Sequence, residues 1–200
     1  MKKYFSGSWR IHILVTILLI SLTALVELSM GRIPICKCGY ISLWYGNTYG
    51  SGNSQHLIDW YTFSHLIHGM IFYGILWLVA RRLPVKTRLI LAILIECIWE
   101  IAENSPVVIE RYRAITSALD YTGDSVINSI SDVLAAASGF WLTSKIRVRL
   151  TLALVATLEI FTLYTVRDNL TLNIIMLTYP VEAIKTWQLD ASFVPPNLKK

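Results

Sequence analysis

The sequence predicts an all-α, polytopic transmembrane helix bundle, and two observations carry this prediction. Hydrophobic residues make up 54% of the 200 residues, charged residues only 16%, and the mean hydropathy is +0.53. Soluble domains average about 45–50% apolar and about 25% charged residues. Apolar runs near the length of about 20 residues that a transmembrane helix needs also recur along the chain. This composition excludes a disordered chain, a collagen and a charged coiled coil, and it argues against a soluble enzyme.

The first apolar run covers residues 11–30 and follows the basic residues Lys2, Lys3 and Arg10. A signal peptide has a similar basic flank, but its apolar core is usually about 7–15 residues long and a small-x-small cleavage site follows it. The run here is longer and no such site follows. We therefore expect an uncleaved first helix.

The remaining spans are expected at residues 63–80, 89–103, 126–144 and 150–166. A further stretch, residues 170–187, is interrupted by Asn173, Pro180 and Glu182, so it is either a sixth span or an amphipathic segment at the membrane surface. The sequence thus predicts a single integral membrane domain, residues 1–200, with five or six spans, a long outer loop at 31–62 and a tail at 188–200.

The distribution of basic residues predicts the orientation. The amino terminus and the connections after the second and fourth spans hold ten of the 18 Lys and Arg residues and no Asp or Glu. Basic residues mark cytoplasmic loops, so the amino terminus is expected in the cytoplasm. The same rule accounts for the net charge of +5. No basic cluster alternates with stacking aromatic residues, so we expect no nucleic-acid partner.

Polar side chains form a stripe near the outer end of each of three predicted helices. Residues three or four positions apart share one helix face. At a rise of 1.5 Å per residue, Glu96, Asp132 and Glu159 are expected about 10–12 Å below the outer surface, and Glu27 is a further candidate. The stripes are His65 and His68 on the second span, Glu96, Glu100 and Glu103 on the third, and Asp124, Asn128 and Asp132 on the fourth.

These stripes predict a polar cavity that is open to the outer side, because charged groups inside a membrane face a bundle interior or water. Closely packed carboxylates cannot all ionise, so some must be protonated, pair with Arg or share a cation. A divalent metal such as Zn, Mn or Fe suits nitrogen and oxygen ligands. The predicted metal ligands are His65, His68, Glu100 and Asp132. The predicted catalytic residues are these four with Glu96 and Asp124, and the predicted substrate-binding residues are Arg111, Arg113, Arg167, Asp168 and Asn169.

Several of these residues also have a structural interpretation. The two histidines could be hydrogen-bonding residues at a helix start, and Glu103 could mark the point where a helix end meets water. Asp124 could cap the helix that starts near residue 125. The residues 167–169 could form a tight turn in which Asp168 or Asn169 caps the next segment.

The outer loop carries Cys36 and Cys38, followed by His56 and Asp59. An outer loop faces an oxidising compartment, so a disulfide and a metal pair are both conceivable, although the one-residue spacing makes an internal disulfide awkward. His56 and Asp59 could cover the cavity mouth, as a lid or as additional ligands. Cys97, in the third span, is expected to serve packing.

Four runs of the sequence, 53–68, 96–113, 120–132 and 167–173, resemble an uncharacterised bacterial family of multi-pass inner-membrane proteins that is described only as a domain of unknown function. This resemblance covers nearly the whole chain. It implies a location in the cell inner membrane and implies no activity.

A weaker similarity extends to the VanZ-like membrane family, known from teicoplanin resistance. In that family a His in one span, a Glu in the next and an Asp-x-Leu-Ala-like start of a third recur. The matching positions here are His65 or His68, Glu96 or Glu100, and Asp132 in the run 131–135. This chain departs from that family by its long Cys-containing outer loop and its additional acidic residues.

Three hypotheses follow. The first is a metal-dependent hydrolase or transferase that acts on a lipid or lipid-linked envelope substrate. The second is a transporter whose carboxylates carry protons or a cation, and the third is a non-catalytic membrane scaffold. The sequence leaves open the substrate and whether the protein binds a protein partner or forms a homo-oligomer.

Overall fold

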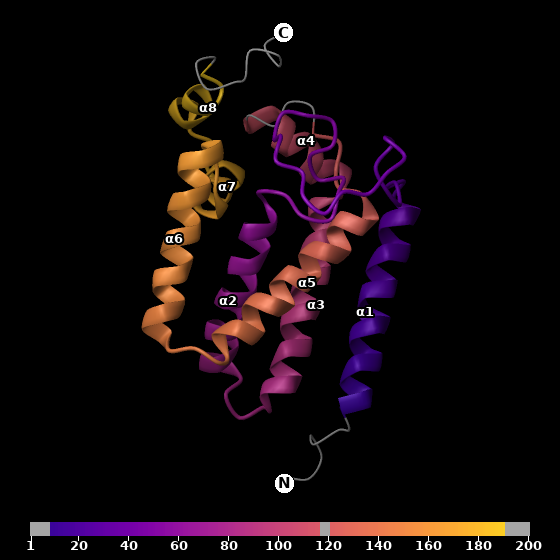
Figure 1. Ribbon diagram of the computed structural model, residues 1–200, viewed down its shortest axis with the longest axis vertical. Coiled ribbons are helices and arrows are strands. Elements are labelled where there is room, and N and C mark those ends of the chain that lie inside the picture. The colour runs from indigo at the N-terminus through magenta and orange to yellow at the C-terminus, as the bar shows by residue number, and fades with distance from the viewer. Residues whose placement is uncertain (1–8, 117–120, 191–200) are drawn as a thin grey trace.

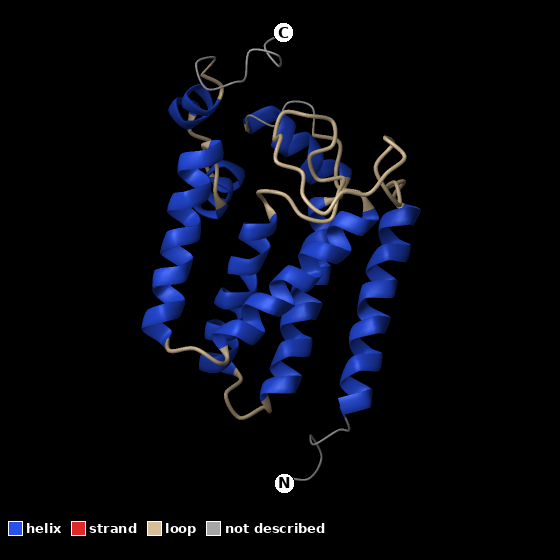
Figure 2. Cartoon of the chain, in the orientation of Figure 1, coloured by secondary structure: helices blue, strands red, loops and turns tan. Residues whose placement is uncertain are grey.

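The computed structural model describes residues 9–116 and 121–190, and this part of the chain is helical throughout its regular structure (Figures 1 and 2). No strand occurs in the described residues, where one isolated parallel β-bridge joins Trp44 and Ile58 in the long loop. The helices are α1 (Trp9–Ser29), α2 (Thr62–Val79), α3 (Val85–Glu103), α4 (Pro106–Ile115), α5 (Val126–Thr143), α6 (Val148–Val166), α7 (Leu170–Thr178) and α8 (Glu182–Gln188).

Four of these helices, α1, α2, α5 and α6, are long and apolar enough to cross a membrane, which indicates a membrane protein as the sequence predicts. Their bounds differ from the predicted ones by at most two residues. The helix α3 has a similar length of 19 residues but contains five charged side chains. These are Lys86, Arg88, Glu96, Glu100 and Glu103.

The stretch 170–187 does not form a sixth spanning helix. It folds as α7, with 9 residues, and α8, with 7, and Pro180 lies between them. A helix that crosses a bilayer needs about 20 residues, so neither is long enough. Both lie beside the upper end of α6 (Figure 1). Lys199 and Lys200, which would agree with a return to the cytoplasm, lie outside the described residues.

The helix α4 is not among the predicted spans, because its 10 residues are too few to cross a bilayer. Ser105 caps its amino terminus, where the side chain accepts a hydrogen bond from the backbone N–H of Val108, and Pro106 occupies the first turn. A Ser–Pro pair at these positions is typical of a helix start. The helix lies at the upper end of the bundle in Figure 1, beside the long loop.

The centre of the bundle is the close pair α2 and α5. An ideal Cβ added to Gly69 would lie 1.8 Å from the carbonyl oxygen of Ala136, and one added to Gly139 would lie 2.0 Å from that of Leu66. Small residues at such positions let the backbones of membrane helices approach closely. The helix α3 packs against both helices, α1 covers α3 and α5, and α6 lies against α2 (Figure 1).

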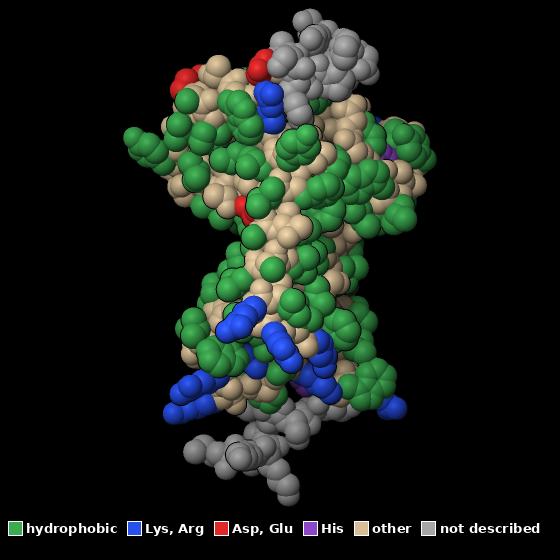
Figure 3. All heavy atoms as spheres, turned by 60° about the vertical axis from the view of Figure 1, so that its left-hand side comes forward, with side chains coloured by type: hydrophobic (Ala, Val, Ile, Leu, Met, Phe, Trp, Pro, Cys, Tyr) green, Lys and Arg blue, Asp and Glu red, His purple; other side chains and the backbone are tan. Residues whose placement is uncertain are grey.

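The surface shows two kinds of side chain in separate places. Large apolar residues of α1 and α6, such as Leu18 and Leu152, are exposed on the outside of the bundle. Figure 3 shows hydrophobic side chains along the middle of the molecule and basic side chains gathered at one end. A protein that spans a bilayer is expected to show this distribution, with apolar side chains where it contacts lipid and a basic rim at one end.

Candidate metal centre and pocket

The amino-terminal halves of α2 and α5 and the carboxy-terminal half of α3 bring five of the six predicted catalytic residues together. Glu96 and Glu100 are 0% exposed, Asp132 is 3% and His65 is 6% exposed, and His68 is half-buried. The two histidines stand one turn apart on α2, and the two glutamates stand one turn apart on α3, so each pair shares one helix face. The three stripes therefore meet in the bundle interior, as the sequence predicts.

Glu96 lies between the two histidines. Its Oε1 is 2.6 Å from Nδ1 of His65 and 3.1 Å from Nδ1 of His68. Nδ1 of His65 is also 3.2 Å from Oε1 of Glu100, and its Nε2 is 3.9 Å from Oδ2 of Asp132. One imidazole nitrogen carries at most one hydrogen, so Nδ1 of His65 cannot fully satisfy two carboxylates.

Several carboxylate oxygens in this cluster lack a hydrogen-bond partner. Neither oxygen of the fully buried Glu100 accepts a hydrogen bond, and the same holds for Oδ1 of Asp132 and Oε2 of Glu103. A buried charged oxygen without a partner is costly unless a proton or a cation neutralises it. The cluster thus holds more carboxyl groups than its two histidines can balance if all are ionised, so a proton or a cation must neutralise the rest.

Within this cluster, two groups of side chains have the composition and spacing of a metal site. They are His65, His68 and Glu96, and His65, Glu100 and Glu103, and within each group the ligand atoms lie within 4.8 Å of one another. Bonds from zinc to nitrogen and oxygen are about 2.0–2.2 Å long, so small side-chain shifts would suffice for one ion to contact a whole group. The predicted ligand set paired both histidines with Glu100 and Asp132. In the structure Glu96 is the carboxylate closest to both histidines. Asp132 lies near the other ring nitrogen of His65, Nε2.

A polar pocket adjoins this cluster and shares His65 and Asp132 with it. The pocket contains about 470 Å³ of space, including the solvent at its mouth. Its walls carry three tyrosine side chains and several carboxylates and amides. The lining residues are Asn53, Ser54, Tyr61, His65, Glu103, Tyr112, Thr116, Tyr121, Asp124, Asn128, Asp132, Asp168 and Asn173.

Asp124 forms part of the pocket wall and does not cap α5. The cap is Ser125, whose side chain accepts a hydrogen bond from the backbone N–H of Asn128. Asp124 instead accepts hydrogen bonds from the side-chain amide of Asn104 at 2.9 Å and from the hydroxyl of Tyr121 at 2.9 Å. Burial raises the pKa of Asp124 above its usual value.

The three arginines among the predicted substrate-binding residues contact backbone carbonyls of the protein. Arg111 donates to the carbonyl of Leu177 at 3.0 Å. Arg113 donates to that of Tyr121 at 2.5 Å. Arg167 donates to that of Trp187 at 2.8 Å. None of the three is among the pocket-lining residues of the described chain.

The residues 168 and 169 have different environments. Asp168 lines the pocket, and burial raises its pKa to about 7. Asn169 caps α7, because its side chain accepts a hydrogen bond from the backbone N–H of Leu172 at 2.8 Å. The structural alternative considered for this turn therefore holds for Asn169.

Glu159 and Glu27 were both candidates for the cluster, and their environments differ. Glu159 accepts hydrogen bonds from the backbone N–H groups of Leu170 and Thr171, each at 3.1 Å, so it stabilises the start of α7 away from the cluster. Glu27 is 0% exposed on α1. Its burial agrees with the expectation that it faces the bundle interior.

The outer loop has two separate polar features. Asp59 accepts hydrogen bonds from the backbone N–H groups of Tyr61 and Thr62, at 2.8 and 3.3 Å, and so holds the start of α2; burial raises its pKa to about 6. Cys36 and Cys38 form a disulfide, which the one-residue spacing had made the less expected alternative. His56 lies beside that disulfide and not beside the cluster.

Comparisons with known proteins agree on one family. Residues 27–190 match the family described as "Protein of unknown function (DUF2585)". The chain is 57% identical to a UPF0314 protein of Rhizobium etli (strain CIAT 652) over 162 residues, which are 81% of this chain and 83% of that protein. It is 53% identical to a UPF0314 protein of Paracoccus denitrificans (strain Pd 1222) over 173 residues, 86% of this chain and 90% of the relative.

No solved structure matches the chain. The resemblance to an uncharacterised family of unknown function is confirmed by these matches, and the similarity to the VanZ-like family stays a prediction. The family match covers the stripes on α2, α3 and α5 as well as the disulfide loop. The chain therefore belongs to the DUF2585 family of proteins of unknown function.

Proposed function

We propose that this protein is a metal-dependent membrane enzyme of the bacterial inner membrane, a hydrolase or transferase that acts on the polar part of a lipid or lipid-linked substrate. The observation that carries the proposal is the buried group of His65, His68 and Glu96 beside a polar pocket. Intramembrane ionisable residues are costly and are typical of functional sites.

In this proposal Nδ1 of His65, Nδ1 of His68 and the carboxylate of Glu96 bind a first-row divalent cation such as Zn²⁺ or Mn²⁺. Asp132, whose Oδ2 is 3.9 Å from Nε2 of His65, would accept the remaining ring N–H after a small shift of its side chain. A carboxylate on the second ring nitrogen is the usual way in which a metal-binding histidine is oriented. Glu100, whose oxygens lack a hydrogen bond, contributes negative charge that the cation would balance.

A bound divalent cation supplies an activated water and polarises a substrate oxygen. Glu100 adjoins His65 and would accept the proton of that water. The hydroxyl groups of Tyr61 and Tyr121 on the pocket wall would donate hydrogen bonds to the substrate. Arg111, Arg113 and Arg167 would take up an anionic headgroup only after they leave the carbonyl groups that they now bind.

The proposed membrane placement has five spans. The helix α3 would be the fifth, since its Glu96 and Glu100 are buried between helices and do not face lipid. The end at which α1 begins carries the basic rim, so it would face the cytoplasm and the pocket would open to the periplasm.

Elemental analysis of the detergent-purified protein, prepared without chelator, tests this proposal. We expect near-stoichiometric metal in the wild type and its loss in His68→Ala and Glu96→Gln. The matched control is Glu110→Gln, which removes an exposed carboxylate of α4 and should leave the metal in place. Hydrolysis of phosphorylated and lipid-linked substrates would then be assayed with the same proteins.

A wild-type protein without metal would overturn the metalloenzyme proposal. Circular dichroism and detergent gel filtration of the same variants separate the remaining hypotheses. A scaffold role predicts that Glu96→Gln unfolds the protein, because the cluster would then serve only to join helices. A transporter role predicts a folded variant that has lost cation or proton flux in vesicles.

A further inference from the structure

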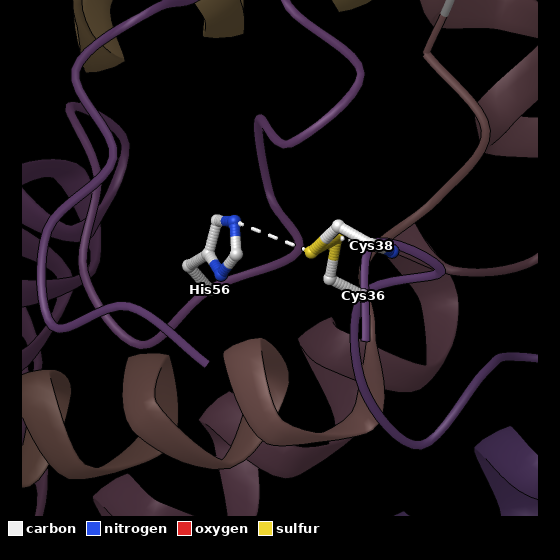
Figure 4. A group of neighbouring side chains, drawn as sticks. All are labelled: Cys36, Cys38 and His56. Atoms are coloured by element: carbon white, nitrogen blue, oxygen red, sulfur yellow. Dashed lines mark hydrogen bonds between the residues drawn. A yellow bond between two sulfur atoms is a disulfide. The ribbon is translucent and has the colours of Figure 1, made fainter. Parts of the chain in front are cut away.

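A second group of reactive side chains lies in the long loop, away from the candidate metal centre. The disulfide between Cys36 and Cys38 faces the imidazole of His56, whose Nε2 is 4.0 Å from Sγ of Cys38 (Figure 4). The backbone N–H of Cys38 donates to Sγ of Cys36 at 3.1 Å. His56 is fixed in place, because its carbonyl accepts a hydrogen bond from the side chain of Asn128 on α5 at 2.8 Å.

The proton position on His56 follows from its second contact. The backbone N–H of Ser42 donates to Nδ1 at 3.1 Å, so Nδ1 is an acceptor and the neutral ring carries its hydrogen on Nε2. The ring is 1% exposed, stacked on Tyr40 and tilted against Tyr45, with ring centroids 5.2 and 5.1 Å away. Burial lowers the pKa of His56, which favours this neutral form.

The same tautomer argues against a metal at this group, although two cysteines and a histidine have the composition of one. A metal on Nε2 would need the lone pair of that nitrogen and would move the hydrogen to Nδ1. Nδ1–H would then face the N–H of Ser42, so two donors would meet. The geometry instead fits an N–H that points at sulfur and stabilises a thiolate.

The two sulfur atoms differ in access. Cys38 is exposed, whereas Cys36 is 6% exposed. An incoming thiolate therefore reaches Cys38 and not Cys36. The bond joins residues two positions apart, so it restricts the unfolded chain little and its effect on stability is small compared with that of a disulfide closing a long loop.

We propose that Cys36 and Cys38 are a redox-active pair that undergoes thiol–disulfide exchange with dithiols, with Cys38 as the attacked sulfur and His56 as the group that stabilises its thiolate. A thiolate of the dithiol attacks Sγ of Cys38, and the bond to Cys36 breaks. Cys36 leaves as a thiolate that accepts the N–H of Cys38 and then takes up a proton. The second thiol of the dithiol, as thiolate, attacks the mixed disulfide and releases Cys38 as a thiolate beside Nε2–H of His56. The dithiol is oxidised to its disulfide, and the two electrons reduce the pair.

The first test uses full-length protein in detergent with Cys97→Ala, so that only the two loop cysteines remain. Dithiothreitol should reduce the pair in the folded protein, and oxidised glutathione should restore the disulfide, as measured by mass after alkylation. In this background Cys36→Ser should form a mixed disulfide with oxidised glutathione at Cys38. The matched variant Cys38→Ser should react at least about tenfold more slowly at the buried Cys36. A disulfide that resists dithiothreitol in the folded protein, or equal rates in the two variants, would overturn the proposal.

The second test measures the role of His56 through the rate of alkylation of Cys38 as a function of pH. In the Cys36→Ser background, His56→Ala should slow the reaction at pH 7 by about tenfold and move its pH midpoint upward. His56→Gln places an amide N–H where Nε2–H lies, so it should restore part of the rate. Unchanged rates in His56→Ala would overturn the assignment. So would stoichiometric zinc on the reduced protein that is lost in His56→Ala, since the group would then be a metal site.

Discussion

Two halves of the same three helices, α2, α3 and α5, differ in the side chains that they bury; the outer half is the one that holds the candidate metal centre, and the inner half is the other. The inner half buries Leu76, Ala92 and Phe140 in an apolar cluster. The outer half buries ionisable side chains, among them Glu96 and Glu100, each 0% exposed. Burial of such groups is unfavourable unless other contacts hold the helices together. The apolar cluster of the inner half, together with the buried side chains of Ile93, Cys97 and Val133 beside the candidate centre, packs the helices, so the ionisable groups are not needed for that purpose.

The boundary between the halves lies at the contact of α2 with α5. Gly69 follows His68 directly and meets the carbonyl of Ala136, one turn beyond Asp132. The close backbone approach therefore begins immediately below the cluster. It fixes the spacing at which His65 faces Asp132.

The largest effect is expected from Gly69→Ala. A Cβ at this position would lie 1.8 Å from the carbonyl oxygen of Ala136, so the two helices would have to move apart. We expect a loss of about 2–3 kcal/mol in the free energy of unfolding, measured by reversible unfolding in detergent micelles. The same change should loosen the metal centre.

The control is Gly74→Ala on the same helix, where an added Cβ has no atom within 4 Å. Alanine is the better helix former, so this variant should be neutral or more stable by about 0.5–1 kcal/mol. Similar losses in both variants would show that the approach of α2 to α5 is not the main contact of the bundle.

The second prediction concerns a polar contact that joins α3 to the start of α5. The side-chain amide of Asn104 donates to Oδ2 of Asp124 and to Oγ of Ser129, at 2.9 and 3.2 Å, and its Oδ1 accepts the backbone N–H of Asp124 at 2.7 Å. Asn104→Ala leaves these buried groups without partners, so we expect a loss of about 2 kcal/mol in the free energy of unfolding. Thr157→Ala, at an exposed position of α6, is the control and should change it little. A neutral Asn104→Ala variant would mean that water replaces the amide.

Much of the fold could be predicted from the sequence, because a bilayer admits few solutions. Apolar runs near 20 residues must form helices there, since no water is present to bond the backbone. The helical period also predicts that the polar residues of each stripe share one face of their own helix. His65, Glu96 and Asp132 each belong to one such stripe. The short helix α4 is not among the predicted spans, because its 10 residues are too few to cross a bilayer, although Val108, Tyr112 and Ile115 follow the helical period.

The site could be predicted only in part, since depth along a helix does not determine which neighbour a side chain meets. Glu159 and Glu96 were expected at similar depth, but α6 packs against α2 and not against α3, and Glu159 bonds to α7. Glu103 was expected to meet water, and in the structure it lines the pocket. The tyrosines of the pocket wall, such as Tyr61, gave no signal in the sequence because they lie outside the helical stripes.

The smallest expected effect comes from Asp168, a buried residue of the pocket wall. Asp168 accepts hydrogen bonds from Tyr61 and Gln188, yet burial raises its pKa from 3.8 to about 7. Between these values the folded protein keeps a proton that the unfolded chain releases, so stability falls as pH rises through this window and levels off above it. Asp168→Asn removes this dependence. Relative to that variant, the wild type should lose about 1 kcal/mol of unfolding free energy for each pH unit between 5 and 6.5.

Glu110→Gln removes one exposed carboxylate of α4 and is the control. A constant difference between wild type and Asp168→Asn across this range would mean that Asp168 is ionised throughout, and that its burial does not hold the proton.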